Sequence, residues 1–254
     1  MSTGDSDQIA ERTTRAEQPQ PQPQPNTSSS VTPAALPSLS ADPAALLSLA
    51  AVQLACKRGT RLLFKGLDLA VESGQMVWVR GQNGRGKTSL LRLVAGLSTP
   101  EEGQVLWGGV PVRRAPGYCP QLVFIGHTNA LKDDLTVTEA LEFLLRLHGR
   151  HHGSALLQAG LERMGLQARR GAMVRTLSQG QRRRVALTRL ALEETPSTWI
   201  LDEPFDSLDV QGVERLNGLL SGHVKRGGRV LLTSHQNLDT SVLQPREVDL
   251  DGYC

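Results

Sequence analysis

Residues 74–97 read GQMVWVRGQNGRGKTSLLRLVAGL and carry the strongest indication of the fold in this chain. The apolar run MVWV predicts a short buried strand, and the leucines and valine after the turn recur at the spacing of one helix face. The turn between them, residues 81–88, fits the pattern G-x-x-x-x-G-K-[ST] in the strand–turn–helix context that the pattern requires. The sequence therefore predicts a phosphate-binding loop inside an α/β fold.

Each residue type in this turn suits a nucleoside triphosphate. Glycines let backbone N–H groups converge on the β- and γ-phosphates, toward which the following helix presents its positive dipole end. The lysine supplies a cation for these phosphates, and the threonine hydroxyl is placed to bind Mg²⁺. The predicted ATP-binding residues are Gly81, Gln82, Asn83, Gly84, Arg85, Gly86, Lys87, Thr88 and Ser89, with Thr88 also a predicted metal ligand. Kinases, GTPases, helicases and transport ATPases all share such a loop.

A second informative element is STWILDEP at residues 197–204, an apolar strand that ends in two acidic residues. Asp202 comes at the end of this strand, where an acid beside a phosphate-binding loop can hold Mg²⁺ directly or through water. Glu203 is then placed to polarise the attacking water, and we predict that it is the catalytic base. The alternative is an acidic turn that only caps the strand.

A third element, LSQGQRRRVALTRLAL at residues 177–192, narrows the possibilities. Ser178 is a natural N-cap, and Gly180 and Gln181 open a helix with apolar residues on a helical period. Its serine hydroxyl, glycine amide and dipole form a second predicted phosphate-binding end. The arginines at 182–184 are interpreted as the solvated face of this helix rather than as a nucleic-acid contact.

With these residues, the chain resembles the ATP-binding-cassette (ABC) ATPases over about residues 50–250. LSQGQ is similar to the signature sequence of that family, Ser207-Leu208-Asp209 to its D-loop, and His235 to its switch histidine. The resemblance implies a P-loop ABC-ATPase fold of the α/β class, with a RecA-like core, an antiparallel β-subdomain and an inserted helical subdomain. The expected nucleotide-binding domain spans residues 46–254, and the helical subdomain about residues 128–184.

The resemblance also implies a mechanism and a partner. Two copies of the chain are expected to pack head to tail as a homodimer, so that each ATP lies between the Lys87 loop of one subunit and the Ser178 helix of the other. ATP and Mg²⁺ are the expected cofactors. His235 is expected to contact the γ-phosphate and help Glu203 orient the water, and Asp209 to carry the signal across the dimer interface.

Two positions depart from the pattern of the family. Where a glutamine is expected about eight residues before the L-T-V segment, counting back from Leu135 gives His127; Gln121 in GYCPQ is the alternative. We favour His127 as the residue that contacts the γ-phosphate. Where an aromatic ring usually stacks on adenine there is Arg58, whose guanidinium can also stack on a purine, so selectivity for ATP over GTP is an open question.

Residues 61–109, the triplet IGH and residues 199–209 resemble the ATPase subunits of the cytochrome c maturation system, a haem exporter family. The resemblance implies integral membrane permease subunits as partners and a peripheral place at the cytoplasmic face of the bacterial inner membrane. The alternative is the ATPase subunit of another small-molecule or lipoprotein exporter. Cassettes of translation and chromosome maintenance usually carry tandem cassettes or a long coiled coil, whereas this chain has one P-loop and no heptad run.

Composition agrees with a globular ATPase that follows an unusual tail. The first 45 residues include EQPQPQPQPNTSSS and are predicted to be disordered, with an interaction arm as the alternative. Five acidic and two basic residues give this tail a net charge of −3; because the whole chain carries +3, the remainder carries +6. That excess fits phosphate ligands or an anionic membrane surface and is too diffuse to indicate nucleic acid.

The remaining sequence features predict no further site. Three widely spaced cysteines lack metal-ligand spacing and indicate idle thiols in a reducing compartment. The most apolar stretch, residues 44–56, is too short to span a bilayer. His148, His151 and His152 could suggest haem ligation, but a glycine-rich turn with histidines is interpreted as a solvated loop.

Overall fold

The structure is a computed structural model that describes residues 48–149, 153–236, 238 and 243–253. These residues belong to one compact unit that spans residues 39–254. The predicted disordered tail, residues 1–45, lies outside the described residues, as do His151 and His152. His148, the remaining histidine of the proposed cluster, is exposed just after a helix.

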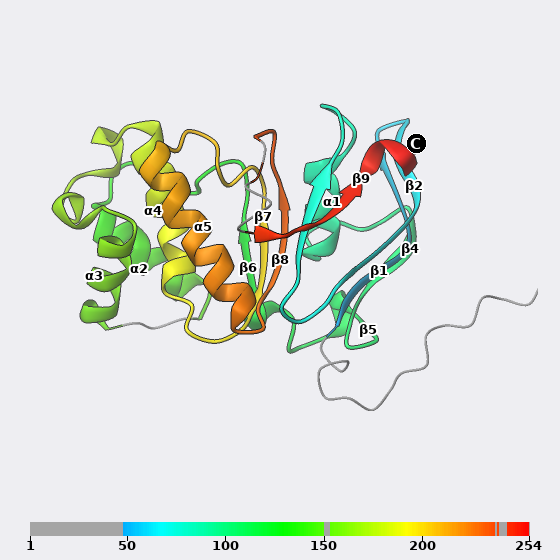
Figure 1. The fold of residues 1–254 in the computed structure, drawn as a ribbon, viewed down its shortest axis with the longest axis horizontal. Helices are drawn as coiled ribbons and strands as arrows, with labels where there is room; N and C mark the ends of the chain where they lie inside the picture. The colour runs from blue at the N-terminus through cyan, green and yellow to red at the C-terminus, as the bar shows by residue number, and fades with distance from the viewer. Residues whose placement is uncertain (1–47, 150–152, 237, 239–242, 254) are drawn as a thin grey trace, which may run out of the picture. The chain divides into compact units, whose positions relative to one another are not determined.

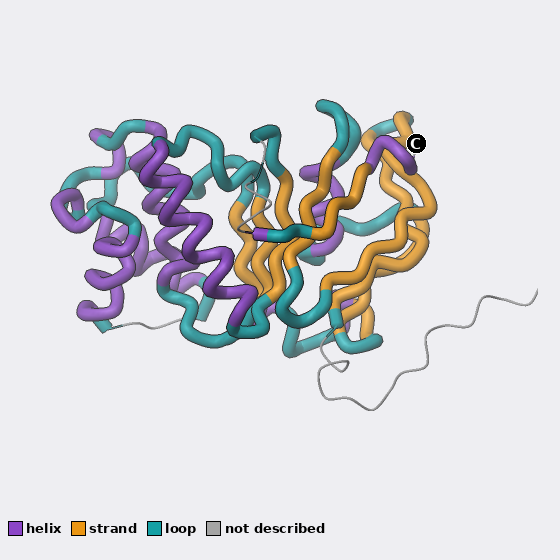
Figure 2. The backbone as a smooth tube through the Cα atoms, in the orientation of Figure 1, coloured by secondary structure: helices purple, strands orange, loops and turns teal. Residues whose placement is uncertain are grey.

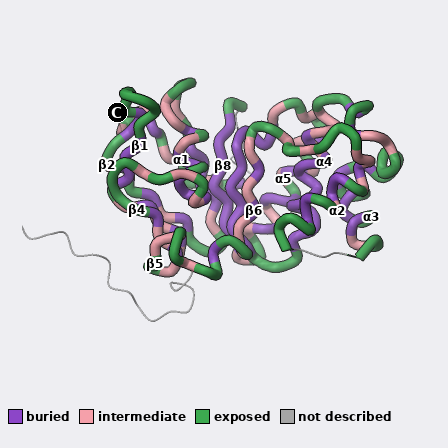
Figure 3. Tube along the Cα trace, turned by 180° about the vertical axis from the view of Figure 1, so that it is seen from behind, coloured by how far each residue is buried: buried purple, intermediate pink, exposed green. Residues whose placement is uncertain are grey.

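A parallel sheet forms the centre of the unit, and its strand pairings among the described residues are all parallel. Within the described residues its strands, in spatial order, are β6 (Leu122–Ile125), β7 (Thr198–Leu201), β8 (Arg229–Thr233), β3 (Met76–Arg80) and β9 (Arg246–Asp249). Every residue of β7 and β8 is buried, as expected for central strands of a parallel sheet with both faces covered. Figure 3 shows these buried strands in the middle of the unit.

An antiparallel sheet lies on the opposite side of the central sheet from most of the helices (Figure 1). In the described part of the chain its strands, in spatial order, are β2 (Arg61–Val71), β1 (Leu49–Arg58), β4 (Glu102–Trp107) and β5 (Val110–Pro111). Residues 49–56, which belong to the most apolar stretch of the sequence, form most of β1. No helix in the described ranges is long and apolar enough to cross a membrane.

Helices cover both faces of the central sheet. On one face, α4 (Gln179–Ala191) contacts β6 and α5 (Val210–Lys225) contacts β8. Helices α2 (Val137–Leu147) and α3 (Ser154–Arg163) pack against α4 and share the hydrophobic core on this side. The other face packs against α1 (Lys87–Val94) and the antiparallel sheet. Figure 2 shows most of the helices on one side of the central strands and the loops that join the strand ends. Short 3-10 helices fill the connections: η2 (Val112–Arg114), η3 (Cys119–Gln121), η4 (Gln167–Arg169), η5 (Val174–Thr176) and η6 (Leu250–Tyr253).

Alternation along the strands separates two hydrophobic cores. In β7, Trp199 and Leu201 belong to the core beneath the helices, whereas Ile200 belongs to the core beneath the antiparallel sheet. This is the period-2 pattern of a strand buried on both faces. The predicted α/β architecture, with a parallel core and a separate antiparallel sheet, is confirmed.

The insertion between β6 and β7 contains α2, α3 and α4. Both α2 and α4 begin with a capping box: Thr136 pairs reciprocally with Glu139, and Ser178 with Gln181. Such boxes satisfy N–H groups that a helix start otherwise leaves unpaired. The predicted limits of the helical subdomain, about 128–184, and of the whole domain, 46–254, stay predictions.

Candidate functional site

The glycine-rich turn joins the end of β3 to the start of α1, as the sequence predicts. Gly81, Gly84 and Gly86 all have positive φ, at 138°, 78° and 98°. A β-carbon at position 86 would lie 3.1 Å from Cβ of Leu63 on β2, so the close approach of the loop to the antiparallel sheet requires glycine. The loop therefore adopts a curl that side chains larger than glycine would strain.

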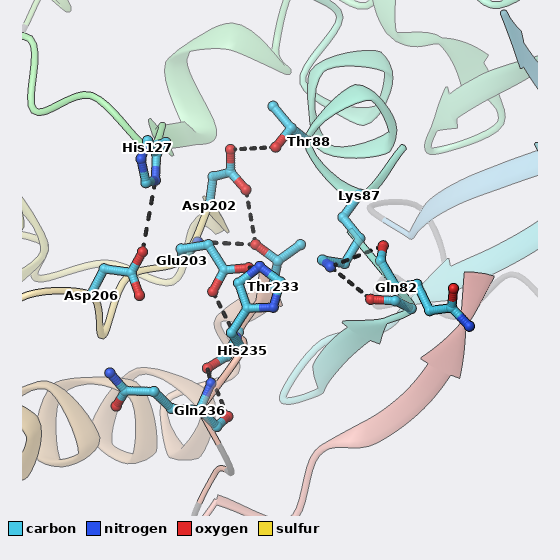
Figure 4. A network of polar contacts seen from close by, with 12 residues as sticks. Gln82, Lys87, Thr88, His127, Asp202, Glu203, Asp206, Thr233, His235 and Gln236 are labelled. Carbon is cyan, nitrogen blue, oxygen red and sulfur yellow. Dashed lines mark hydrogen bonds and ion pairs between the residues drawn. The ribbon is translucent and has the colours of Figure 1, made fainter. Parts of the chain in front are cut away.

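Lys87 lies inside this curl. Its Nζ donates to the carbonyl oxygens of Gly81, at 2.7 Å, and Gln82, at 3.4 Å (Figure 4). The lysine is 8% exposed, so its ammonium group is held in the loop rather than in bulk solvent. A phosphate that enters the loop meets a cation already positioned there.

A carboxylate from the end of the chain braces the same loop. Asp251 accepts a hydrogen bond from the backbone N–H of Gln82, at 3.1 Å to Oδ2, and its Oδ1 lies 3.0 Å from Nε of Arg85. Sequence reasoning missed Asp251, because it is 169 residues from Gln82 and lies in no recognisable motif. Its role follows from β9, which pairs with β3 and brings η6 beside the turn.

The acidic pair after β7 faces the glycine-rich turn. Thr88 Oγ1 donates to Oδ2 of Asp202 at 2.9 Å, and Thr233 Oγ1 donates to Oδ1 at 2.9 Å. Asp202 is 2% exposed, so its two oxygens are aligned by neighbours rather than by solvent. Hydroxyl and carboxylate oxygens are the ligands that Mg²⁺ prefers, and Thr88 and Asp202 fit that ion.

Glu203 and His235 form a contact pair beside Asp202 (Figure 4). The backbone N–H of His235 donates to Oε2 of Glu203 at 2.8 Å, and Nε2 of the imidazole lies 3.3 Å from Oε1. Burial raises the pKa of the Glu203 carboxyl, while the His235 N–H, the His235 imidazole and Lys87 oppose the rise. Glu203 also has φ 48°, an uncommon conformation for a residue other than glycine.

Thr233 is a further residue that the motif analysis missed. Besides its bond to Asp202, its hydroxyl oxygen accepts the N–H of Glu203 at 3.0 Å. Because Thr233 ends β8 next to β7, the adjacent parallel strands place it between the two acids. The signal available was its position two residues before His235 in TSH.

These groups line one cavity of about 400 Å³. The described residues that line it are Arg58, Arg61, Leu63, Asn83, Gly84, Gly86, Lys87, Thr88, Ser89, His127, Asp202, Glu203, Asp206 and His235. Most of the predicted loop, the two predicted acids, both predicted histidines and the predicted base-stacking arginine thus line one cavity. Gly81 and Gln82 line a neighbouring hollow instead, and Arg85 is not among the residues that line either one. Arg61 was not predicted; it begins β2, across the turn from Arg58.

The structure separates the two candidates for the glutamine position. His127 follows β6 and lines the cavity, where its Nδ1 lies 3.8 Å from Oδ2 of Asp206. Gln121 precedes β6 and lines a different hollow with Pro120 and residues 192–197. The length of the strand therefore lies between Gln121 and the cavity end of the sheet.

The signature residues Ser178, Gly180 and Gln181 are not among the cavity-lining residues. They form the exposed to half-buried N-terminus of α4, where Ser178 Oγ accepts the N–H of Gln181 at 3.2 Å. A β-carbon on Gly180 would lie 2.5 Å from the carbonyl oxygen of Ser207. The segment 207–209 therefore packs directly against the start of this helix, and Asp209 caps α5.

The interpretation of residues 182–184 as a solvated face is wrong for Arg183. This side chain is 3% exposed and points beneath the acidic turn, where its Nη2 donates to the carbonyl oxygens of Asp202 and Glu203 at 2.8 and 2.7 Å. The helical period explains the error: Arg183 is four residues before Leu187 and shares its buried face. Arg182 and Arg184 are only partly exposed and pair with Asp133 and Asp209.

Comparisons with known proteins agree with this geometry. The family model described as "ABC transporter" matches residues 64–206. This chain belongs to the ABC transporter family. Its members share the ATP-binding cassette, and the chain is an ATP-binding and ATP-hydrolysing subunit. Proteins of this kind act as dimers in complexes with membrane subunits.

Curated relatives are similar over most of their length. The chain is 47% identical to the cytochrome c biogenesis ATP-binding export protein CcmA of Pseudomonas fluorescens, which covers 80% of this chain and 96% of that protein. CcmA of Albidiferax ferrireducens is 44% identical, with 78% and 94% covered. CcmA of Haemophilus influenzae is 43% identical, with 79% and 93% covered.

Solved structures support the fold. A putative ABC transporter ATP-binding protein from Pyrococcus furiosus superposes with a TM-score of 0.70 at 22% identity, covering 81% of this chain and 98% of the other. An ATP-binding subunit of an ABC transporter gives a TM-score of 0.65 at 25% identity, with 74% and 79% covered. The predicted ABC-ATPase fold is confirmed.

Proposed function

We propose that this chain is the ATPase subunit of a bacterial cytochrome c maturation complex, which uses ATP to export haem or release it to a haem chaperone. The observation that carries the proposal is the identity of 42–47% to proteins named CcmA, over 92–99% of their length. The partners are then the permease subunits of that system, and the chain works at the cytoplasmic face of the inner membrane.

In this proposal the nucleotide phosphates occupy the curl around Lys87. ATP displaces the two carbonyl contacts of the Lys87 ammonium, which then binds the β- and γ-phosphates. Thr88 and Asp202 hold Mg²⁺, and their side-chain oxygens, 2.9 Å apart, support this assignment. When bound, Mg²⁺ neutralises charge on the phosphate oxygens.

Glu203 acts as the base that takes a proton from the attacking water. A carboxylate whose pKa is raised by burial is a stronger base than one in solvent, which suits this task. His235 holds the Glu203 carboxylate through its backbone N–H, and its imidazole, which lines the same cavity, contacts the γ-phosphate. His127, at the same end of the cavity, contacts the γ-phosphate side, and Arg58 stacks on the purine.

Two chains complete two sites. Within one chain the Ser178 end of α4 is not part of the Lys87 cavity, which supports a head-to-tail dimer in which Ser178, Gly180 and Gln181 bind the nucleotide of the partner. In this proposal, Asp209 carries the signal across the dimer interface. Binding of ATP then closes the dimer and hydrolysis opens it, which moves the membrane subunits.

Co-purification tests the proposal. The tagged chain is purified from detergent-solubilised membranes of its own host, and the partners are identified by mass spectrometry. We expect cytochrome c maturation permease subunits, and we expect loss of haem-loaded c-type cytochromes when Lys87→Ala replaces the wild type. Intact c-type cytochromes in that strain, or recovery of a different permease, would favour another small-molecule or lipoprotein exporter.

A further inference from the structure

Arg183 is a buried cation that the ATPase chemistry described above does not use. It lies on α4, five residues after Ser178, and is 3% exposed. Burial lowers the pKa of its guanidinium, although the nearby Asp206, Asp202 and Glu203 charges oppose that effect. An arginine remains charged in proteins, so α4 carries a positive charge into the protein interior.

The acceptors around this guanidinium come from two strand ends. Beyond β7 they are the carbonyl oxygens of Asp202, Glu203 and, at 3.4 Å from Nε, Pro204. Beyond β6, Nη1 donates to the carbonyl oxygen of Gly126 at 2.9 Å and to Oδ1 of Asn129 at 3.1 Å. One side chain therefore joins the turn that carries Glu203 to the loop that carries His127.

Packing α4 against the sheet through a buried guanidinium costs desolvation free energy. All five acceptors are neutral oxygens, so no direct ion pair with them offsets the desolvation of the guanidinium. Apolar residues elsewhere on α4, such as Val185 and Leu190, pack without such a cost. We therefore attribute to this buried guanidinium a role in holding the two strand ends in position, rather than a role in stabilising the fold.

The backbone of Glu203 shows what is being positioned. Its φ of 48° is unfavourable for an L side chain and persists where neighbours over-determine it. Its N–H is held by Thr233, its carboxylate by His235, and its carbonyl oxygen by Arg183. Arg183 is the one of these three contacts that comes from the signature helix.

We infer that Arg183 is a positioning residue that couples the signature end of α4 to Glu203 and His127 of the same chain. The inference rests on the proposed roles of Glu203 and Ser178. When the partner's ATP engages Ser178 and shifts α4, the guanidinium moves the carbonyls of both strand ends together. Each chain thereby links the nucleotide at its signature helix to the water-activating group at its own P-loop.

Steady-state ATP hydrolysis by purified Arg183→Lys and Arg183→Gln tests the inference. Lysine keeps the charge but cannot reach acceptors on both strand ends at once, because it lacks the planar fork of arginine. We expect Arg183→Lys to lower kcat by about 10- to 100-fold, while KM changes less than about threefold, since nucleotide binding does not use Arg183. A nucleotide-binding titration confirms that the variant population is folded and competent.

Arg182→Gln is the matched control. Arg182 is next to Arg183 on α4, but its Nη1 pairs with Asp133 at 2.7 Å, away from the acidic turn. We expect kcat of this variant to stay within about twofold of the wild type. If Arg183→Gln is too unstable to purify, Arg183→Lys carries the test.

The inference is overturned if Arg183→Lys keeps wild-type kcat, if its KM rises as much as its kcat falls, or if Arg182→Gln loses as much activity. These results are independent of the cytochrome c assignment, because the assay measures only ATP hydrolysis. An error in the role of Glu203 would instead appear as wild-type activity in Glu203→Gln.

Discussion

At the scale of single residues, we propose that nucleotide binding depends on the positive charge of Lys87. Its ammonium contacts two loop carbonyls and lies among residues that line the cavity. We expect Lys87→Ala to abolish measurable ATP binding, because the charge-assisted bonds to the β- and γ-phosphates are lost. Equilibrium binding of a fluorescent ATP analogue measures this.

Lys65→Ala is the control for that experiment. Lys65 pairs with Glu102 on the antiparallel sheet, and both side chains are more than half exposed. Wild-type affinity in Lys65→Ala together with lost binding in Lys87→Ala would support the assignment. Retained binding in Lys87→Ala would contradict it.

His127 and Gln121 allow a second test at the residue scale. Since His127 lines the cavity and Gln121 lines a separate hollow, we expect His127→Ala to lower the ATPase rate by about tenfold and Gln121→Ala to leave it unchanged. The comparison is made with both purified variants at saturating ATP. The reverse pattern would show that Gln121 is the residue that senses the γ-phosphate.

At the scale of elements, His223 joins α5 to β7. Its ring stacks on Trp199 with centroids 3.6 Å apart, and its Nε2 lies 2.9 Å from the carbonyl oxygen of Ser197. A β-carbon on Gly228 would lie 2.1 Å from Nε2 of this ring. The chain just before β8 can therefore pass this close to His223 only with glycine at position 228. Burial lowers the pKa of His223 to about 4, mainly by desolvation.

This contact predicts a dependence of stability on pH. The folded state keeps His223 neutral, while the unfolded chain takes up a proton below pH about 6.5, so the free energy of unfolding falls between pH 6.5 and 4. The difference between the pKa of His223 in the unfolded chain and its pKa in the folded state corresponds to about 3 kcal/mol in the free energy of unfolding. Urea unfolding of the wild type at pH 7 and pH 4.5 measures the loss.

Two variants test whether His223 causes the loss of stability at acid pH. In His223→Phe, which keeps a ring on Trp199, we expect most of the stability loss at acid pH to disappear. Stability at neutral pH also falls, because the carbonyl oxygen of Ser197 loses its contact with Nε2 of His223 and keeps only the backbone N–H of Arg229. His148→Gln, which changes an exposed histidine, is expected to retain the full loss. An unchanged pH dependence in His223→Phe would exclude His223 as the group responsible.

At the scale of the whole molecule, the separation of the signature end from the Lys87 cavity predicts a dimer that ATP holds together. We expect Glu203→Gln to bind ATP, to lose hydrolysis by about 10²- to 10³-fold, and to accumulate as a stable dimer, because the bound nucleotide is no longer cleaved. Size-exclusion chromatography with light scattering, with and without ATP, measures the change.

The double variant Glu203→Gln, Lys87→Ala is the control, and we expect it to stay monomeric with ATP because it cannot hold the nucleotide. A Glu203→Gln protein that hydrolyses ATP at the wild-type rate would remove Glu203 as the base. A protein that stays monomeric while it binds ATP would instead exclude the head-to-tail arrangement.

From the sequence alone it was possible to predict the α/β class, the glycine-rich loop at residues 81–89 and the acidic pair at residues 202 and 203 after a buried strand. These features are local: a strand, a glycine turn, a lysine and a helix follow one another within a few residues, so their periodicity and spacing carry the information. The cap at Ser178 is local for the same reason. Counting residues back from Leu135 favours His127, but the sequence does not show at which end of the central sheet His127 lies.

Which distant groups meet depends on how the strands and helices pack in three dimensions. Asp251 reaches the loop through pairing of β9 with β3, Thr233 lies between the acids because β8 is next to β7, and Arg183 turns inward because α4 packs over the strand ends. From the sequence, the three arginines at 182–184 are expected to face solvent, and only the packing of α4 shows that Arg183 is buried. Contacts across a sheet depend on strand order, which local periodicity does not encode.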